Sequence, residues 1–256
     1  MKNEKIIAII GALHGDERVG VEVIKRLKKI IDGENIVGIV ANEEGLKRGK
    51  RFISQDLNRS FPGNPKGNPE ERIAYKLTKK IKKFDYVLDL HSFSCKSEPF
   101  AVLTKKTKSH LNLAESSGIR KIVLMLPKLA SGKALIDYCP CGISIETGRY
   151  DLESTFKRAM FYTENILGTL GFLKKRKRKT GGIDYFKIID VFFKEGDEEV
   201  VEGITNFKLI YKGETVASGR QRKVVAPYDF YPVLARERAY PNIVCLAAKR
   251  VKIEKR

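Results

Sequence analysis

The chain has 256 residues with 50 basic and 31 acidic side chains, a formal net charge of +19 at pH 7. Its length allows one large domain or two modest ones, and its 42% hydrophobic and 32% charged residues are typical of a globular protein. No apolar run approaches the roughly 18 residues of a membrane-spanning helix and no leader peptide is visible, so we expect a cytoplasmic protein without a membrane segment.

Strand-like and helix-like segments alternate through the first 173 residues. Apolar runs at 5–12, 35–42 and 85–92 predict strands, and residues 17–31 and 70–84 show the apolar spacing of helices. Further strands are expected at 100–104, 121–126 and 142–148, followed by a helix over 152–173. The alternation predicts an α/β fold with a mixed, mostly parallel sheet flanked by helices.

The character of the sequence changes after Leu173. A dense basic run, KKRKRK (174–179), is followed by short apolar runs separated by turn residues. We therefore expect an α/β domain over 1–175 and a small antiparallel β domain over 183–256. The basic run could contact RNA, but we prefer to interpret it as a solvated linker. The other lysines are interpreted as part of a solvated surface.

Two of the three histidines directly follow predicted strands. His14 comes after the first strand and His91 after the strand at 85–92, so both can lie in one crevice beyond the carboxyl ends of the strands. Glu17 lies three residues after His14, and two histidines with one glutamate form a common open zinc site. Alternatively, Glu17 only favours a helix N-terminus and His14 is a loop residue. His110 lies in a polar stretch and is expected at the surface.

The loop RFISQDLNRSFPG (51–63) carries two arginines, an aspartate and an asparagine. Two arginines in a short loop indicate carboxylate recognition, although a solvated turn is the alternative. Glu146 is an acid inside an apolar strand. Facing the crevice, it would have a raised pKa and suit a general base; facing solvent, it would have no such role.

Four motifs in this order resemble one family. GALHGDE, RFISQDLNRSFPG, DLHS and ISIETG, together with YPVLARERAYP (231–241), are similar to the succinylglutamate desuccinylase and aspartoacylase family, zinc hydrolases related to the metallocarboxypeptidases. The resemblance implies a zinc-carboxypeptidase-like fold. It also implies one Zn²⁺ per chain, held by His14, Glu17 and His91.

The resemblance also implies roles for the remaining motif residues. Asp56 would orient a ligand histidine, Arg51 would polarise the scissile carbonyl, and Glu146 would be the general base. The substrate-binding residues would be Asn58, Arg59 and Tyr240, with Lys133 standing where aspartoacylase has an arginine.

We therefore expect a zinc-dependent hydrolase that cleaves the amide bond of an N-acyl amino acid or a similar small carboxylate. One alternative is a metallocarboxypeptidase acting on peptide C-termini. An open groove would favour this peptide substrate, whereas a C-terminal β domain that caps the active-site crevice would favour a small molecule. Another is a non-catalytic nucleic-acid-binding or anion-binding protein, motivated by the positive charge but disfavoured by the complete set of ligand residues. A small anionic substrate is the expected partner, and a homo-oligomer is left open.

Overall fold

The computed structural model describes residues 5–30, 34–125, 132–174 and 181–253. Up to residue 170 its helices and strands are, in chain order, β1 (Ile7–Gly11), α1 (Val19–Leu27), β2 (Ile36–Val40), α2 (Glu43–Arg48), η1 (Leu57–Arg59), α3 (Pro69–Ile81), β3 (Tyr86–Phe93), β4 (Phe100–Leu103), α4 (Lys108–Ser116), β5 (Lys121–Leu124), η3 (Leu135–Tyr138), β6 (Gly142–Arg149) and α5 (Glu153–Leu170). The elements described after α5 are all strands: β7 (Asp184–Phe193), β8 (Glu199–Val200), β9 (Thr215–Ser218), β10 (Lys223–Val225), β11 (Tyr231–Val233) and β12 (Ile243–Val251).

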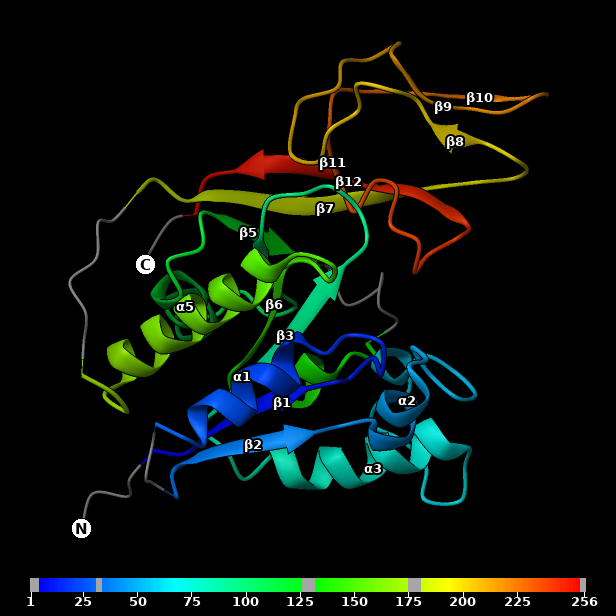
Figure 1. The fold of residues 1–256 in the computed structure, drawn as a ribbon. Coiled ribbons are helices and arrows are strands. Elements are labelled where there is room, and N and C mark those ends of the chain that lie inside the picture. The colour runs from blue at the N-terminus through cyan, green and yellow to red at the C-terminus, as the bar shows by residue number, and fades with distance from the viewer. Residues whose placement is uncertain (1–4, 31–33, 126–131, 175–180, 254–256) are drawn as a thin grey trace.

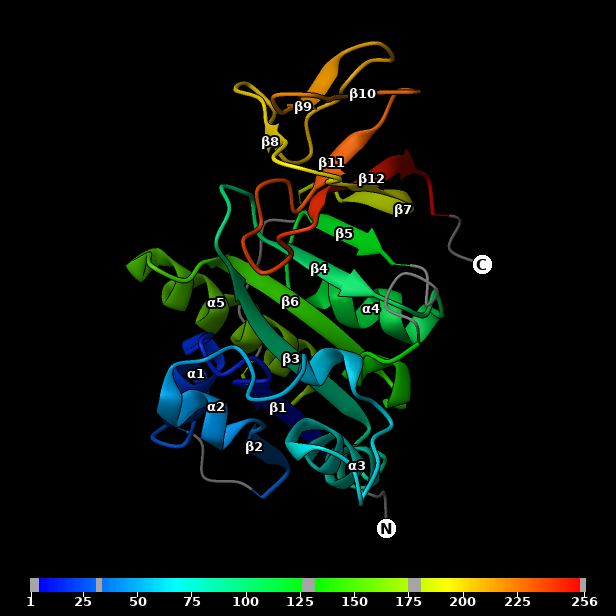
Figure 2. The same ribbon diagram turned by 90° about the vertical axis from the view of Figure 1, so that its right-hand side faces the viewer.

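Within these residues, nine strands form one sheet in the order β11-β12-β7-β5-β4-β6-β3-β1-β2. The pairs β1–β2, β1–β3, β3–β6, β4–β5 and β5–β7 are parallel. The pairs β4–β6, β7–β12 and β11–β12 are antiparallel. The predicted mixed, mostly parallel sheet flanked by helices is therefore confirmed (Figures 1 and 2).

Alternating strand residues divide the core between the two faces of this sheet. Ile7 and Ile9 of β1 belong to the cluster that includes α1, α4 and α5, whereas Ala8 and Ile10 belong to the cluster that includes α3. This period of two is what a strand with both faces buried requires. Beyond β6, the α3 face continues into a cluster of β4, β7 and β12 that C-terminal loop residues cover.

Strand direction determines which residues meet at the edge of the sheet. β1, β3 and β6 run parallel, so their carboxyl ends lie at the same edge. β4 runs against β6, with Phe100 opposite Glu146 and Val102 opposite Ser144. The site described below lies at the edge formed by β1, β3 and β6.

The C-terminal residues extend the large sheet. β7 pairs in parallel with β5, from Lys121 opposite Asp184 onwards, and β12 and β11 follow it. β8, β9 and β10 form a separate small sheet beyond the β11 end (Figure 1). The division into domains over 1–175 and 183–256 stays a prediction, and residues 175–180 of the predicted basic linker lie outside the described residues.

Two helices, α2 and α4, were not among the predicted elements. α2 has only six residues and α4 begins with polar residues, so neither has the long apolar spacing that predicts a helix.

The expectation that His110 lies at the surface is wrong. His110 is 3% exposed on α4, and its Nδ1 lies 2.6 Å from the hydroxyl of Thr107, the residue that caps the helix. Among the described helices, none is long and apolar enough to cross a membrane.

Gly15, in the loop between β1 and α1, packs directly on the backbone of α2 and the residues after it. A Cβ atom there would lie 2.1 Å from the carbonyl carbon of Gly45 and 2.4 Å from the carbonyl oxygen of Lys50. We expect Gly15→Ala to lower the free energy of unfolding by about 1–3 kcal/mol, because the backbone itself must shift. Denaturant titration measures this. Gly182→Ala is the matched control, since its added Cβ meets no atom within 4 Å; equal stability of both variants would contradict the prediction.

Candidate active site

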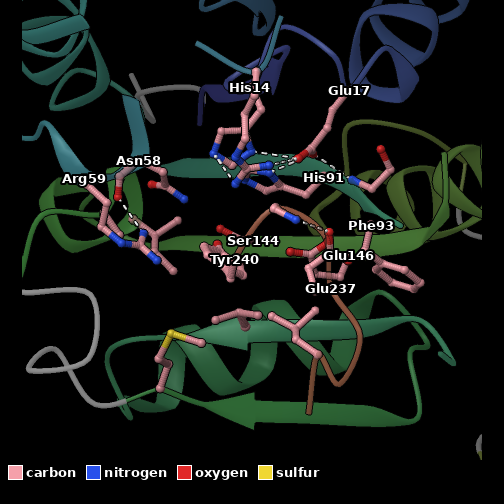
Figure 3. A pocket seen from close by; sticks show the side chains of 18 of the residues that line it. His14, Glu17, Asn58, Arg59, His91, Phe93, Ser144, Glu146, Glu237 and Tyr240 are labelled. Carbon is pink, nitrogen blue, oxygen red and sulfur yellow. Dashed lines mark hydrogen bonds and ion pairs between the residues drawn. The ribbon is translucent and has the colours of Figure 1, made fainter. Parts of the chain in front are cut away.

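Three buried side chains meet at the edge formed by β1 and β3. His14 and Glu17 belong to the loop after β1, and His91 lies near the carboxyl end of β3. Each offers a ligand atom, and these atoms lie within 4.8 Å of one another. The Nδ1 atoms of His14 and His91 lie 2.8 and 3.1 Å from the two carboxylate oxygens of Glu17 (Figure 3). The three side chains that the sequence predicts as ligands thus form one cluster.

An acidic residue lies against the outward nitrogen of each histidine. Nε2 of His14 is 3.1 Å from Oδ1 of Asp56, the contact that the predicted role of Asp56 requires. Nε2 of His91 is 2.6 Å from Oδ2 of Asp89, which also accepts a hydrogen bond from the Ser144 hydroxyl at 3.0 Å. A carboxylate at Nε2 favours the tautomer whose Nδ1 faces Glu17 and could bind a metal. At His14, Nη2 of Arg51 also lies 3.0 Å from Nε2.

Asp89 is a site residue that the sequence reasoning missed. It is fully buried, on the same face of β3 as His91 because the two are separated by two positions. An acid in the apolar run YVLDL, two residues before a predicted ligand, is the signal that could have found it.

The charges in the cluster shift its pKa values. Burial disfavours ionised Glu17, but His14 and His91 outweigh this and hold the pKa of Glu17 well below its usual value. Burial likewise disfavours protonated His91, but Asp89 and Glu17 raise its pKa well above the usual value. A buried site with three carboxylates around two imidazoles strongly attracts positive charge. Two imidazole nitrogens and one carboxylate are a donor set that fits a divalent transition metal.

Arg51 lies on the same cluster. Its Nη1 donates to Oε1 of Glu17 at 3.0 Å, and its Nη2 donates to Oδ2 of Asp56 at 3.3 Å. Burial works against the guanidinium charge, but Glu17, Tyr240 and Asp56 raise the pKa of Arg51. It therefore stays cationic beside the ligand atoms.

Asn58, Arg59 and Tyr240 line the same cavity (Figure 3). Asn58 accepts a hydrogen bond from the backbone of Leu135 at 2.9 Å, which places η1 against η3. The ring of Tyr240 lies 5.6 Å from the guanidinium carbon of Arg51 and 6.0 Å from that of Arg59. The tyrosine thus bridges the two arginines through cation–π contacts.

Glu146 lies on β6 directly opposite His91 of β3. Its Oε2 atom is buried and has no hydrogen-bond partner among the described residues. Burial raises the pKa of Glu146 to about 8; His91 opposes this shift, and Glu17 and Glu237 add to it. Glu146 is therefore a partly buried acid with a raised pKa, and it points into the cavity (Figure 3).

The cavity has a volume of about 70 Å³, and a wider outer cavity of about 410 Å³ adjoins it. Lys133 is exposed and is not among the described lining residues, so the structure does not bring it together with the other predicted residues. Its substrate-binding role stays a prediction.

The loop that carries Tyr240 is tied to the large sheet by Glu237. The Glu237 carboxylate accepts hydrogen bonds from the backbone and hydroxyl of Ser94, both at 2.8 Å, and from the backbone of Ala239 at 3.1 Å. Asn206 secures the same loop by accepting from the backbone of Ala235 at 2.8 Å. Glu237 was not predicted, and its position within the motif YPVLARERAYP is the only sequence signal for it.

Comparison with known proteins identifies the family of this chain. The model of the succinylglutamate desuccinylase/aspartoacylase catalytic domain matches residues 3–164. N-alpha-acetyl-L-2,4-diaminobutyric acid deacetylase of Halomonas elongata is 37% identical over 93 residues, which are 33% of this chain and 27% of that protein. A probable aspartoacylase of Trichodesmium erythraeum is 33% identical over 107 residues, 36% of each chain. Both alignments cover well under half of the relative's length.

The fold matches over a longer range. The crystal structure of murine aminoacylase 3 superposes with a TM-score of 0.80 and 18% identity, and the match covers 97% of this chain and 96% of that one. At this identity the likeness establishes the fold alone. Because the catalytic-domain model spans more than half of the residues and includes every predicted metal ligand, the chain belongs to the succinylglutamate desuccinylase/aspartoacylase family.

Proposed function

We propose that this protein is a zinc-dependent hydrolase that cleaves the amide bond of an N-acyl amino acid or a similar small carboxylate. The observation that carries the proposal is the convergence of His14, Glu17 and His91 opposite a partly buried Glu146. Family membership supports it, as do the deacetylase and aspartoacylase names of the curated relatives.

The three ligand residues would hold the metal through Nδ1 of His14, Nδ1 of His91 and the Glu17 carboxylate. When bound, zinc acts as a Lewis acid and lowers the pKa of a coordinated water from 15.7 to about 7. Asp56 and Asp89 keep the two imidazoles in the ligating orientation by accepting from their Nε2 atoms.

Glu146 is the proposed general base. It accepts a proton from the water that attacks the carbonyl carbon, and it then delivers this proton to the nitrogen of the leaving amine. Burial raises the pKa of Glu146 in the metal-free site, and a raised pKa favours uptake of the proton that is then passed on. Burial keeps other hydrogen-bond partners away from its Oε2 atom.

The arginines divide two tasks between them. Arg51, which lies beside Glu17, would donate to the carbonyl oxygen as it gains negative charge. Arg59, with Asn58, would bind the substrate carboxylate, and Tyr240 would keep both guanidinium groups in place through its ring. Lys133 is not among the described residues that line the cavity, so its position does not support the proposed contact with the substrate.

The covered cavity favours a small substrate over a peptide C-terminus. Leu234, Glu237 and Tyr240 of the C-terminal loop line it, so this loop closes one side of the space beside the ligand residues. A metallocarboxypeptidase needs an open groove for its peptide. The cytoplasmic location, the small anionic partner and the oligomeric state stay predictions.

Replacing the proposed base tests the mechanism. We expect Glu146→Gln to lower kcat for an N-acyl amino acid by about 10²–10⁴-fold, because the proton transfer loses its acceptor. The bound zinc, measured by plasma mass spectrometry, should stay unchanged, since Glu146 is not a ligand. A variant with intact zinc and more than one third of the wild-type kcat would contradict the role of Glu146.

Replacing Asp89 tests whether the carboxylate behind His91 supports metal binding. We expect Asp89→Asn to weaken zinc binding by about 10–100-fold, because His91 loses the carboxylate that orients it. Competition with a chromogenic chelator measures this affinity. Asp85→Asn is the control, since Asp85 precedes β3 at the opposite end and contacts the backbone of Ile6. Equal zinc affinity of both variants would argue against the role of Asp89.

A further inference from the structure

One part of the active-site cavity has no task in the proposed mechanism. Beyond Glu146 the cavity continues along β6 to Ser144, two residues nearer the start of that strand and about 7 Å away. Besides the polar Thr104, the cavity is lined by five apolar residues of β4, of the segments on either side of residues 126–131 and of the C-terminal loop: Val102, Met125, Ala134, Ile136 and Leu234. We call these five residues the apolar arm.

The apolar arm is held in place by its neighbours. Ile136 and Ala134 are 2% and 5% exposed and belong to the segment that Asn58 contacts through the backbone of Leu135. Leu234 starts the loop that Asn206 and Glu237 secure. The hydroxyl of Ser144 donates to Asp89, so this donor is already engaged. The arm is therefore a preformed apolar surface.

Few cationic side chains line the cavity. Among its described lining residues, Arg51 and Arg59 are the only arginines, and no lysine is present. Arg51 is paired with Glu17 and Asp56, which leaves Arg59 for a substrate carboxylate. Among the described residues that line the cavity, a second carboxylate entering the arm would meet no cation, and burying it unpaired is strongly disfavoured.

We infer that the substrate carries a single carboxylate and an apolar group that fills the arm. The apolar group belongs to the acyl chain or to the amino-acid side chain; in both cases N-acyl aspartate and succinyl amino acids are poor substrates. This inference rests on the proposed function and specifies its substrate class.

Two substrate series distinguish the sources of the apolar group. The first is N-acetyl-L-alanine, -norvaline and -norleucine, and the second is N-acetyl-, N-butyryl- and N-hexanoyl-L-alanine, all with the zinc-loaded full chain. In one series we expect kcat/KM to rise about fourfold per methylene, the equivalent of about 0.8 kcal/mol per buried CH₂. N-acetyl-L-aspartate and N-succinyl-L-alanine should lie about 100-fold below the best member. Faster hydrolysis of either dicarboxylic substrate would overturn the inference.

A cation placed in the arm should reverse this preference. Met125 is partly buried and has a long, flexible side chain, so Met125→Arg is the substitution the site accommodates most easily. We expect Met125→Arg to shift the ratio of dicarboxylic to apolar substrates by about 100-fold. Ile30→Arg is the control, because Ile30 is 47% exposed and absent from the cavity lining; the same shift in both variants would count against the arm.

Ligand binding separates this inference from the proposed function. Calorimetry compares hexanoate and succinate with the full chain, in the presence and absence of zinc. If hexanoate binds more tightly than succinate and Met125→Arg weakens this binding, the result supports the apolar arm. If in addition no N-acyl amino acid is hydrolysed, that second result rejects only the proposed function. Tighter binding of succinate would overturn the inference even in an active hydrolase.

Discussion

The carboxylate of Glu17, held between two imidazoles, is the interaction on which the rest of the site depends. Both of its oxygens face an Nδ1 atom, and the backbone of Ser92 donates to Oε2 at 2.9 Å. Such an arrangement requires that β1 and β3 be neighbours and run parallel, since otherwise His14 and His91 would lie at opposite edges of the sheet. The topology of the sheet thus creates the cluster, and Asp56 and Asp89 orient it.

The C-terminal residues form one side of the cavity whose other residues come from the N-terminal strands and loops. β7 joins the large sheet beside β5, and the chain returns through β11 and β12, so the loop between these two strands reaches the ligand cluster. Glu237 ties that loop to Ser94, just after β3. Closure of the cavity and the placement of Tyr240 therefore depend on the same hydrogen bonds.

Much of this architecture can be predicted from local sequence patterns. The apolar run before His14 and the helical spacing after Glu17 predict a strand, a loop and a helix, and the structure has β1 and α1 there. Short or polar helices such as α2 and α4 escape this reasoning because they have too few apolar positions to show a period. His110 is buried for a related reason: its neighbours in sequence are polar, but α4 packs against the sheet.

The site is harder to predict than the fold, because contacts between distant residues leave no local pattern. His14, Glu17 and His91 are recognisable from strand ends and spacing, whereas Asp89 becomes a site residue only because β3 places it behind His91. Glu237 acts through Ser94, 143 positions away. Lys133 shows the opposite case, since a charge expected from a family resemblance lies on the surface.

The most direct test of metal binding is X-ray diffraction from crystals grown with equimolar zinc, recorded on both sides of the zinc absorption edge. We expect one anomalous peak per chain, bonded to Nδ1 of His14, Nδ1 of His91 and the carboxylate of Glu17. A cluster without a peak, or zinc bound only by other residues, would contradict the metal centre proposed for this protein.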